Sequence, residues 1–571
     1  MDNQRNMILA IVLSALVLLG WSLLSDRLLP TANPPATKVV QGKQVPVPPP
    51  ATVAPKAVQD RATVLRESMG QRVRIDTPSV AGSINLKGAR VDDLVLKRHR
   101  ETIAKNAPPV RLLSPEGGPQ PIYAQFGWAG QGVQLPGNDT VWQADGTLLA
   151  PGHPVTLSWS NGSGQTFRIR LSIDQNYMIA AEQSVANGGS VPVAVRPFAL
   201  VKHTGLSPDP DTWTVHTGPM GVFDGVANYS IKSKDLDGAG PEGKSFTSTG
   251  GWLGFTDKYW LTAIIPPQGA HVNASFRSIG DKVYLAAFTP TDQAVLAPGK
   301  AATSTSHLFS GAKEVGVLQA YERDLKITQF DKAIDWGWFA FFERPIFWLL
   351  DYLFKAVGNF GFAIILLTLI VRGAMFPIAQ RQFASMAAMR ALQPKVKALQ
   401  ERHKEDKQKL QQEMLELYKR EKVNPLAGCL PIVIQIPIFY ALYKVLILTI
   451  EMRHQPFILW IKDLSAPDPA TVVNLFGYLP FTPPHFLALG VLPILLGITM
   501  YIQFKLNPAQ MDPAQQQVFS IMPWVFMFIM SGFAAGLQLY WTVSNLLAIA
   551  QQKFLYSRYP ALKNAPGTAT T

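Results

Sequence analysis

The feature that most constrains this chain is an apolar run at residues 360–378, FGFAIILLTLIVRGAMFPI, in which Arg372 is the only formal charge. At about 1.5 Å per residue, a helix of this length crosses most of a hydrocarbon core roughly 30 Å thick. An arginine in that core costs about 2.5 to 3.5 kcal/mol on insertion scales, so such a charge tends to mark a pathway or a water-filled cavity. The alternative is a snorkelling arginine, whose guanidinium reaches the lipid headgroups. The position of Arg372 alone leaves both interpretations open.

Further apolar runs predict a protein that crosses the membrane six times, with both termini in the cytoplasm. Residues 7–24 are long for the core of a signal peptide and lack a convincing cleavage site after them, which favours an uncleaved signal anchor. This topology places residues 381–422, which carry eleven Lys or Arg and six Asp or Glu, in the cytoplasm, as the positive-inside rule predicts.

The net charge of +13 could suggest a nucleic-acid partner, but the densest basic segment lies between two apolar spans. We therefore expect no nucleic acid. Cys429 is the only cysteine, so an intrachain disulfide is excluded. A chain of 571 residues exceeds one ordinary domain, and we expect a soluble part and a membrane part.

Residues 61–329 predict a large antiparallel β-sandwich. Residues 166–173 alternate polar and apolar side chains, and residues 154–164 resemble a strand that runs into an Asn-Gly turn. The orientation of the anchor places this domain outside the cytoplasm. The preceding residues 30–60 are rich in proline and predict an extended tether. The domain shows no recognisable catalytic constellation, and we expect neither a cofactor nor a metal.

Residues 238–245, GAGPEGKS, match the phosphate-loop pattern. That motif needs a buried strand before it and a helix after it, so that backbone amides meet the phosphates. The flanking residues KDLD and FTSTGGW fit neither element. A surface loop is the favoured interpretation.

Two helical segments surround the arginine-bearing span. Residues 330–356 are rich in aromatic residues and are interrupted by Pro345, which favours an amphipathic helix at the membrane surface over a packed globular helix. Residues 379–423 predict a cytoplasmic hairpin of two amphipathic helices with a thin apolar seam. That seam packs the hairpin or recruits clients and partners. Its residues are Met386, Met389, Leu392, Leu410, Met414 and Leu417.

Polar residues recur inside the later apolar spans. Thr368 and Arg372 lie four apart, hence on one helix face, and Gln435 adds an amide. On the last span the spacing i, i+3, i+4 and i+7 places four residues on one face, which suggests a hydrated, net-positive groove. Helix–helix hydrogen bonding is the alternative for the amides and hydroxyls. The four residues are Gln538, Trp541, Thr542 and Asn545, and Tyr540 beside them is included in the predicted groove.

Several motifs carry a resemblance to a known family. Residues 367–377 (LTLIVRGAMFP), 385–395 (SMAAMRALQPK), 422–445 (KVNPLAGCLPIVIQIPIFYALYKV) and 531–545 (SGFAAGLQLYWTVSN) resemble the YidC family of membrane protein insertases in its Gram-negative form. The resemblance is motif-specific from about residue 331 to residue 559 and weaker in the β domain.

The resemblance implies a non-enzymatic insertase and chaperone of the bacterial inner membrane with a periplasmic super-sandwich. Its implied partners are nascent membrane proteins, the Sec translocon, the ribosome or targeting machinery, and membrane lipids. It also implies that Arg372 receives polar or acidic parts of the incoming chain, and that Thr368 and Trp541 line or close the groove. Trp541 stands where some relatives carry tyrosine.

Two rival functions follow from the same residues. A secondary transporter usually needs mid-membrane carboxylates and inverted repeats, and neither is evident in the sequence. A membrane-anchored carbohydrate-active sandwich would not need five further spans.

The expected order of segments is anchor 1–29, tether 30–60, sandwich 61–329, interfacial helix 330–356, span 357–378, hairpin 379–423, span 424–450, periplasmic loop 451–485, spans 486–506, 515–531 and 536–555, and cytoplasmic tail 556–571.

Overall fold

The computed structural model describes residues 37–40, 43–46, 58–209, 214–240, 242–403, 406–421, 430–476, 478, 479, 481, 488–506 and 513–558. The predicted anchor at residues 7–24 lies outside these residues. The chain divides at residue 58 into two units. In the first unit, β1 (Thr37–Val40) and β2 (Lys43–Pro46) pair as an antiparallel hairpin, which the prediction of an extended tether did not include.

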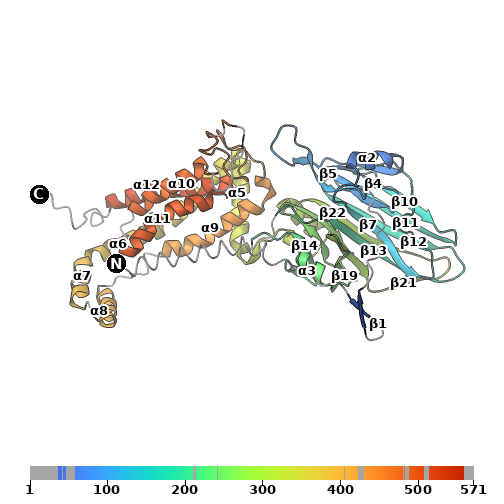
Figure 1. Cartoon of the computed structure of the whole chain (residues 1–571), viewed down its shortest axis with the longest axis horizontal. Helices are drawn as coiled ribbons and strands as arrows, with labels where there is room; N and C mark the ends of the chain where they lie inside the picture. Colours follow the sequence, from blue (N-terminus) through green and yellow to red (C-terminus); the bar gives the residue numbers. More distant parts are fainter. Residues whose placement is uncertain are drawn as a thin grey trace. The chain divides into compact units, whose positions relative to one another are not determined.

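The second unit contains two large sheets, in which the hydrogen-bonded strand pairs are antiparallel apart from the parallel pair β3–β9 (Figure 1). The first sheet follows the order β15 (Val226–Asn228), β14 (Gly218–Phe223), β17 (Trp252–Thr256), β18 (Trp260–Ile265), β22 (Ala301–Ala312), β12 (Met178–Asn187), β11 (Gln165–Ile173), β10 (Val155–Ser160) and β8 (Gln143–Ala144). The second follows β16 (Lys244–Thr249), β19 (His271–Ser278), β20 (Val283–Pro290), β13 (Val193–Thr204), β7 (Ile122–Gln131), β5 (Arg90–Arg100), β4 (Val80–Asn85), β3 (Arg72–Asp76) and β9 (Leu148–Leu149), with β21 (Ala294–Leu296) on β13 and β6 (Pro109–Leu113) on β5.

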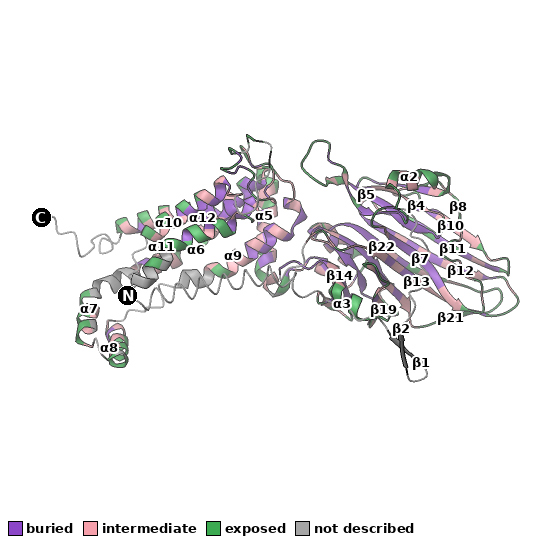
Figure 2. Ribbon diagram, in the orientation of Figure 1, coloured by how far each residue is buried: buried purple, intermediate pink, exposed green. Residues whose placement is uncertain are grey.

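The alternation seen in the sequence explains how these strands build a core. Phe167, Ile169 and Leu171 of β11 are buried, while the residues between them are half-buried or exposed. The β10–β11 hairpin pairs Ser160 with Thr166 around the predicted turn. Burying every second side chain of a strand places one face of the sheet in the core, and Figure 2 shows buried residues along both sheets. The predicted β-sandwich is confirmed.

Short helices join or flank the strands. They are α2 (Arg61–Glu67), η1 (Met69–Gln71), α3 (Ser233–Gly238) and α4 (Val315–Asp324). The phosphate-loop pattern lies where α3 ends and β16 begins, so a helix precedes the loop and a strand follows it. That order is the reverse of the one a phosphate loop requires, which agrees with the predicted surface loop.

The segment after the sandwich contains η2 (Phe330–Ala333), η3 (Gly337–Phe339) and α5 (Ala340–Val357). The prediction that Pro345 interrupts this segment is wrong, because α5 runs through it. Pro345 lies early in the helix, where the loss of one backbone N–H donor affects a single turn. The helix exposes Phe341, Trp348 and Tyr352, and its position at the membrane surface stays a prediction.

The arginine-bearing helix α6 extends from Phe360 to Ala391, through Pro377. The sequence had predicted a division of this segment at residue 378 into a span and a hairpin helix. The hairpin helices are instead α7 (Gln393–Arg402) and α8 (Lys407–Arg420), with Leu392 between α6 and α7. Pro394 explains this break, since it has no backbone N–H to continue the hydrogen bonds of α6 and proline suits the first turn of a new helix.

The remaining helices are α9 (Leu430–Leu448), η5 (Ile450–Met452), α10 (Val491–Leu506), α11 (Pro513–Met530) and α12 (Ala535–Arg558). Among the described residues, one helix segment, Phe360–Ser385, is long and apolar enough to cross a membrane, with a mean hydropathy of 2.2. Three shorter apolar helices accompany it, at Gln435–Leu448, Val491–Leu506 and Ser520–Met530. The total of six membrane crossings therefore stays a prediction. Helix α12 packs against α6 and α10, and α5 packs against α6 and α9.

Candidate functional site around Arg372

Helix α6 presents the first two predicted site residues one turn apart. The Thr368 side chain is fully buried, and its hydroxyl donates to the Ile364 carbonyl oxygen at 2.6 Å. Its hydrogen bond is therefore made within its own helix, a common way for threonine to satisfy its hydroxyl in an apolar setting. Arg372 lies four residues later, where α12 packs against α6.

The guanidinium of Arg372 is bonded to a neutral side chain. Its Nε and Nη2 atoms donate to the Ser544 hydroxyl oxygen of α12, at 3.0 Å and 2.7 Å. Ser544 is buried. Among the described residues, no carboxylate forms an ion pair with Arg372. Two donors on one hydroxyl leave the positive charge uncompensated and leave further donors of the planar fork available.

Gln435 of α9 and Tyr540 of α12 adjoin this pair. The Gln435 amide donates to the Tyr540 hydroxyl oxygen at 3.1 Å. Tyr540 lies one turn before Ser544, is buried, and interacts electrostatically with Arg372. Arg372, Gln435, Tyr540 and Ser544, which we call the Arg372 cluster, thus join three helices through neutral polar groups around one cation.

Trp541 covers a different part of α12. Its ring is half-buried and packs against Phe439 of α9 and Phe526 of α11, with ring centroids 4.3 Å and 4.5 Å apart. The phenol hydroxyl next to Arg372 belongs instead to the preceding residue, Tyr540. The aromatic at position 541 therefore serves packing between helices.

Three further predicted residues lie outside the Arg372 cluster, and two of them form hydrogen bonds elsewhere. The Gln538 amide donates to the carbonyl oxygens of Met530 and Phe533, at 2.8 Å and 2.7 Å, at the turn between α11 and α12. Asn545 donates to the Thr499 hydroxyl of α10 at 3.2 Å. The Thr542 hydroxyl is buried with no partner among the described residues. These contacts are the helix–helix bonds that formed the alternative to a groove role.

Comparison with known proteins places this arrangement in a family. Residues 72–349 match the model described as the YidC periplasmic domain, and residues 352–563 match the model described as the 60Kd inner membrane protein. A membrane protein insertase YidC from Zymomonas mobilis subsp. mobilis is 50% identical over 563 residues, which cover 98% of this chain and 96% of that protein. The chain belongs to the YidC family of membrane protein insertases.

Other members of the YidC family agree over the same length. The protein of that name from Methylorubrum extorquens is 46% identical and covers 98% of this chain and 96% of its own. A solved structure described as an active YidC insertase with the first transmembrane domain resolved covers 84% of this chain and 92% of its own, at 19% identity and a TM-score of 0.35. The two family-model matches identify the chain as an inner-membrane protein of the YidC family with a large periplasmic β domain.

Ser544 is the member of the Arg372 cluster that sequence reasoning missed in this YidC-family chain. The predicted face of α12 followed Gln538, Trp541 and Asn545, whereas Tyr540 and Ser544 form a second stripe at i and i+4. A serine in an apolar helix is often satisfied by its own backbone, so it attracted no attention. The signal available was its helical spacing from Tyr540.

The predicted seam of the hairpin is only partly covered by the structure. Leu392 and Leu417 are buried, and Leu410 and Met414 are half-buried. The side chains of Met386 and Met389 lie outside the described residues. The ion pair of Lys395 and Glu421, with Nζ and Oε1 2.7 Å apart, joins the two ends of the hairpin, and the Lys395 charge lowers the pKa of Glu421.

Proposed function

We propose that this chain is a non-enzymatic insertase and chaperone that places nascent proteins in the inner membrane, alone or together with the Sec translocon. Membership of the YidC family supports insertion as the activity. The observation that carries the mechanism is the guanidinium of Arg372, which is held by the Ser544 hydroxyl and by no carboxylate among the described residues.

The physical problem in insertion is the polar part of the client. Carrying a hydrophilic tail across about 30 Å of hydrocarbon is costly because its polar groups lose their water. We propose a hydrated groove, open to the cytoplasm and to lipid, in which Arg372 is the polar end. Such a groove shortens the apolar path, and the apolar client helix leaves it sideways into the bilayer.

The neutral partner of Arg372 suits a transient acceptor. A carboxylate already paired with the arginine would have to be displaced by the client, whereas the Ser544 hydroxyl orients the guanidinium and leaves its charge uncompensated. At an effective dielectric of about 20, a charge pair 4 Å apart is worth roughly 4 kcal/mol before desolvation. An acidic client tail is therefore attracted to Arg372 without a permanent competitor.

We further propose the six-span topology predicted from the sequence, with both termini in the cytoplasm. The charge distribution supports it, because the eleven-cation segment at residues 381–422 then lies on the cytoplasmic side. The β domain lies in the periplasm. Arg372 itself lies between that domain and the hairpin in the chain, and the other members of the Arg372 cluster follow the hairpin, in α9 and α12.

The hairpin of α7 and α8 is proposed to recruit ribosome-bound clients or targeting machinery. Its surface is rich in charge, and its thin seam buries Leu392 and Leu417. Crosslinkers placed along residues 386–417 should capture ribosome-bound client chains. Capture by probes near Arg372 together with none along the hairpin would count against recruitment.

The groove proposal is tested by changing both the arginine and the charge of the client tail. One client, with its tail acidic, neutral or basic, is inserted by chains carrying Arg372, Arg372→Lys or Arg372→Ala at matched protein level. We expect Arg372→Ala to impair the acidic tail most. Arg372→Lys should keep partial function because the charge remains without the planar fork.

Arg381→Ala is the matched control, because Arg381 is an exposed cation on the same helix. It should insert all three clients as the unchanged chain does. Equal insertion of every tail in every background would overturn the groove proposal and favour a snorkelling arginine. Loss confined to the acidic-tail client with Arg372→Ala would exclude the snorkelling interpretation.

A further inference from the structure

A basic pocket lies where the loop after β5 meets the segment that follows η5. It has a volume of about 380 Å³, and its lining includes Arg98, Arg100 and Lys105 of the β domain together with Arg453 and Lys462. The two sides are bonded to each other. The Arg453 guanidinium donates to the carbonyl oxygens of Arg100 at 2.8 Å and of Glu101 at 3.1 Å.

Arg453 is also fixed by aromatic rings, since its guanidinium carbon lies 5.1 Å from the Trp260 ring centre and 5.8 Å from that of Tyr259. A cation stacked in this way is oriented by the cation–π attraction and remains charged. Burial lowers the pKa of the neighbouring His454, and the charge of Arg453 lowers it further.

The cations of the pocket exceed its carboxylates. None of the five forms an ion pair with a described residue. The carboxylates that line this pocket and the adjoining one are Glu101 and Asp463, and Asp463 lies 3.8 Å from the ring of His454. The pocket therefore presents arginine and lysine charges that no described carboxylate neutralises in an ion pair, which favours a bound phosphate or carboxylate.

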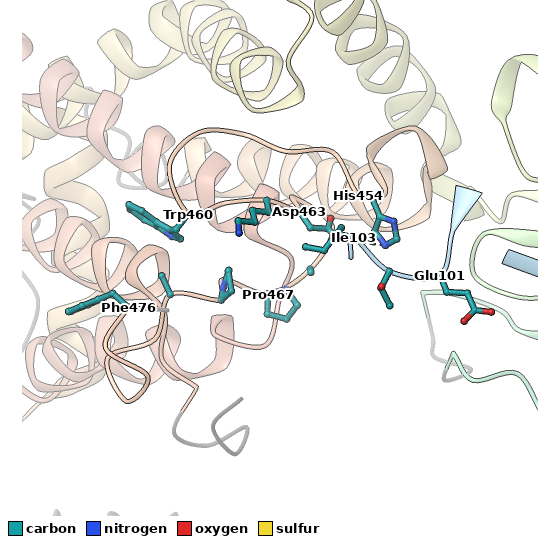
Figure 3. A pocket seen from close by; sticks show the side chains of 12 residues that line it. Glu101, Ile103, His454, Trp460, Asp463, Pro467 and Phe476 are labelled. Atoms are coloured by element: carbon teal, nitrogen blue, oxygen red, sulfur yellow. Dashed lines mark ion pairs between the residues drawn. The ribbon is translucent and has the colours of Figure 1, made fainter. Parts of the chain in front are cut away.

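An apolar pocket of about 540 Å³ adjoins the basic one and shares Thr102, Ile103, His454 and Lys462 with it. Figure 3 shows Ile103 and His454 toward one end of this pocket and Trp460 and Phe476 toward the other. A ligand that fills both pockets must carry an anionic group and an apolar group next to each other.

The segment between α9 and α10 exposes large apolar side chains in a strained backbone. Leu459, Leu475 and Phe476 have φ values of 57°, 50° and 58°, and their exposed fractions are 79%, 56% and 51%. Bulky residues rarely adopt positive φ, and such strain persists where the surroundings enforce it. Exposure of this kind is unfavourable in water and favourable in a bilayer.

A buried carboxylate holds this segment in place. Asp468 accepts hydrogen bonds from the Trp460 indole at 3.0 Å, from the Ala470 amide at 3.0 Å and from the Leu492 amide at 2.7 Å. Leu492 is in the first turn of α10. The apolar side chains are thus fixed at the end of an apolar helix, on the side of the membrane that carries the β domain.

We infer that the two pockets together bind an anionic phospholipid of the periplasmic leaflet. Its phosphate lies against Arg98, Lys105, Arg453 and Lys462, and the start of its acyl chains lies along Trp460 and Phe476. Basic pockets beside membrane helices recognise headgroups in this way. The site holds the β domain against the membrane surface, and it does not depend on the insertase function proposed above.

The test uses full-length protein in neutral detergent and fluorescent phosphatidylglycerol. The double variant Lys105→Glu with Lys462→Glu reverses two exposed cations of the pocket, and Lys234→Glu with Lys300→Glu makes the same charge change at exposed sites of the β domain. We expect the first pair to weaken binding about tenfold or more and the second to leave it unchanged. Circular dichroism of both variants checks that they are folded.

Further arms distinguish the lipid from other anions. Phe476→Ser should weaken phosphatidylglycerol binding and leave binding of soluble glycerol phosphate as it was, since only the lipid reaches Phe476. Phosphatidylcholine should bind all variants equally. Equal phosphatidylglycerol binding by both double variants would overturn the inference. Full displacement of the lipid by millimolar glycerol phosphate or by an acidic peptide would assign the pocket to a soluble phosphate or to a client chain instead.

Discussion

Two arginines, Arg72 in the periplasmic β domain and Arg372 in the helical region, have opposite kinds of partner. In the β domain, Arg72 pairs with Asp92, and both side chains are almost fully buried. In the helical region, Arg372 bonds to the Ser544 hydroxyl and pairs with no carboxylate in the part of the chain that the structure describes. A charge paired inside a fold maintains structure, because removing one partner leaves the other without compensation. A cation that has no carboxylate partner can instead attract an acidic group of a client chain.

The largest effect expected from this comparison is on the β domain. Asp92→Ala should lower its free energy of unfolding by about 3 to 5 kcal/mol, because the Arg72 guanidinium is left buried and unpaired. Hydrogen exchange of the β3 to β5 amides in the full-length protein measures this loss. Asp76→Ala is the control, since its pair with Lys97 is exposed, and it should change exchange little. Equal changes in hydrogen exchange for Asp92→Ala and Asp76→Ala would show that the buried pair of Arg72 and Asp92 does not maintain the β domain.

The next effect concerns a carboxylate at the junction of the two regions. Glu451 follows α9, and its Oε1 accepts from the Val315 amide, at the first turn of α4, at 3.1 Å. Burial raises the pKa of Glu451 to about 7. Between pH 4.5, the ordinary pKa of the group, and pH 7, the folded protein keeps the Glu451 carboxyl protonated, whereas the unfolded chain has already released that proton. The stability that this group contributes is present at low pH and falls as the pH rises through 7.

Glu451→Gln should accordingly be more stable than the unchanged chain at pH 8, by on the order of 1 to 3 kcal/mol, and about equal to it at pH 4.5. Thermal unfolding across that pH range is the measurement. Glu67→Gln, at an exposed position, should show no such dependence. A stability difference that stays constant with pH would show that Glu451 does not titrate in this window.

A smaller effect is expected at Ser544. Ser544→Ala removes the only described hydrogen-bond acceptor of Arg372, so insertion of an acidic-tail client should fall about fivefold, the equivalent of about 1 kcal/mol. Ser544→Thr should restore most of it because the hydroxyl returns. If Ser544→Ala lowered insertion of acidic and basic tails equally, Ser544 would serve helix packing and not the orientation of Arg372.

The smallest effect should follow the largest deletion. Removal of residues 61–300 should leave insertion close to that of the intact chain, since the Arg372 cluster lies entirely in the helices. In vitro insertion at matched levels of the membrane region measures this. Loss of insertion while the helical region remains folded and abundant would contradict this prediction and show that the β domain is needed for insertion.

The sequence predicted what short-range patterns encode. The strict alternation at residues 166–173 predicted β11, and the single charge in an apolar run was enough to mark Arg372 as a candidate site residue. The pairing of β12 with β22 was not predictable, because the strands are more than a hundred residues apart and register over that distance is set by the packed core.

The candidate site shows the same limit. Thr368 and Arg372 stand out on one helix, but the choice between Trp541 and Tyr540 as the aromatic beside Arg372 depends on how α12 is rotated against α6. Rotation is set by packing between helices and leaves no local trace in the sequence. Ser544 was missed for that reason, and Gln538 was expected in a groove although it bonds the turn before its own helix.

The unbroken helix α6 has a mechanical consequence. It continues from the predicted membrane span to Ala391, just before the hairpin. One helix therefore joins Arg372 to the start of the hairpin, and Arg372 and Ala391 lie about 28 Å apart at 1.5 Å per residue. Pro377 lies five residues after Arg372, and a proline inside a helix is the position at which we expect the helix to bend. If the hairpin binds a ribosome-bound client as proposed, a force on the hairpin would be transmitted along α6, and bending at Pro377 would move the Arg372 guanidinium.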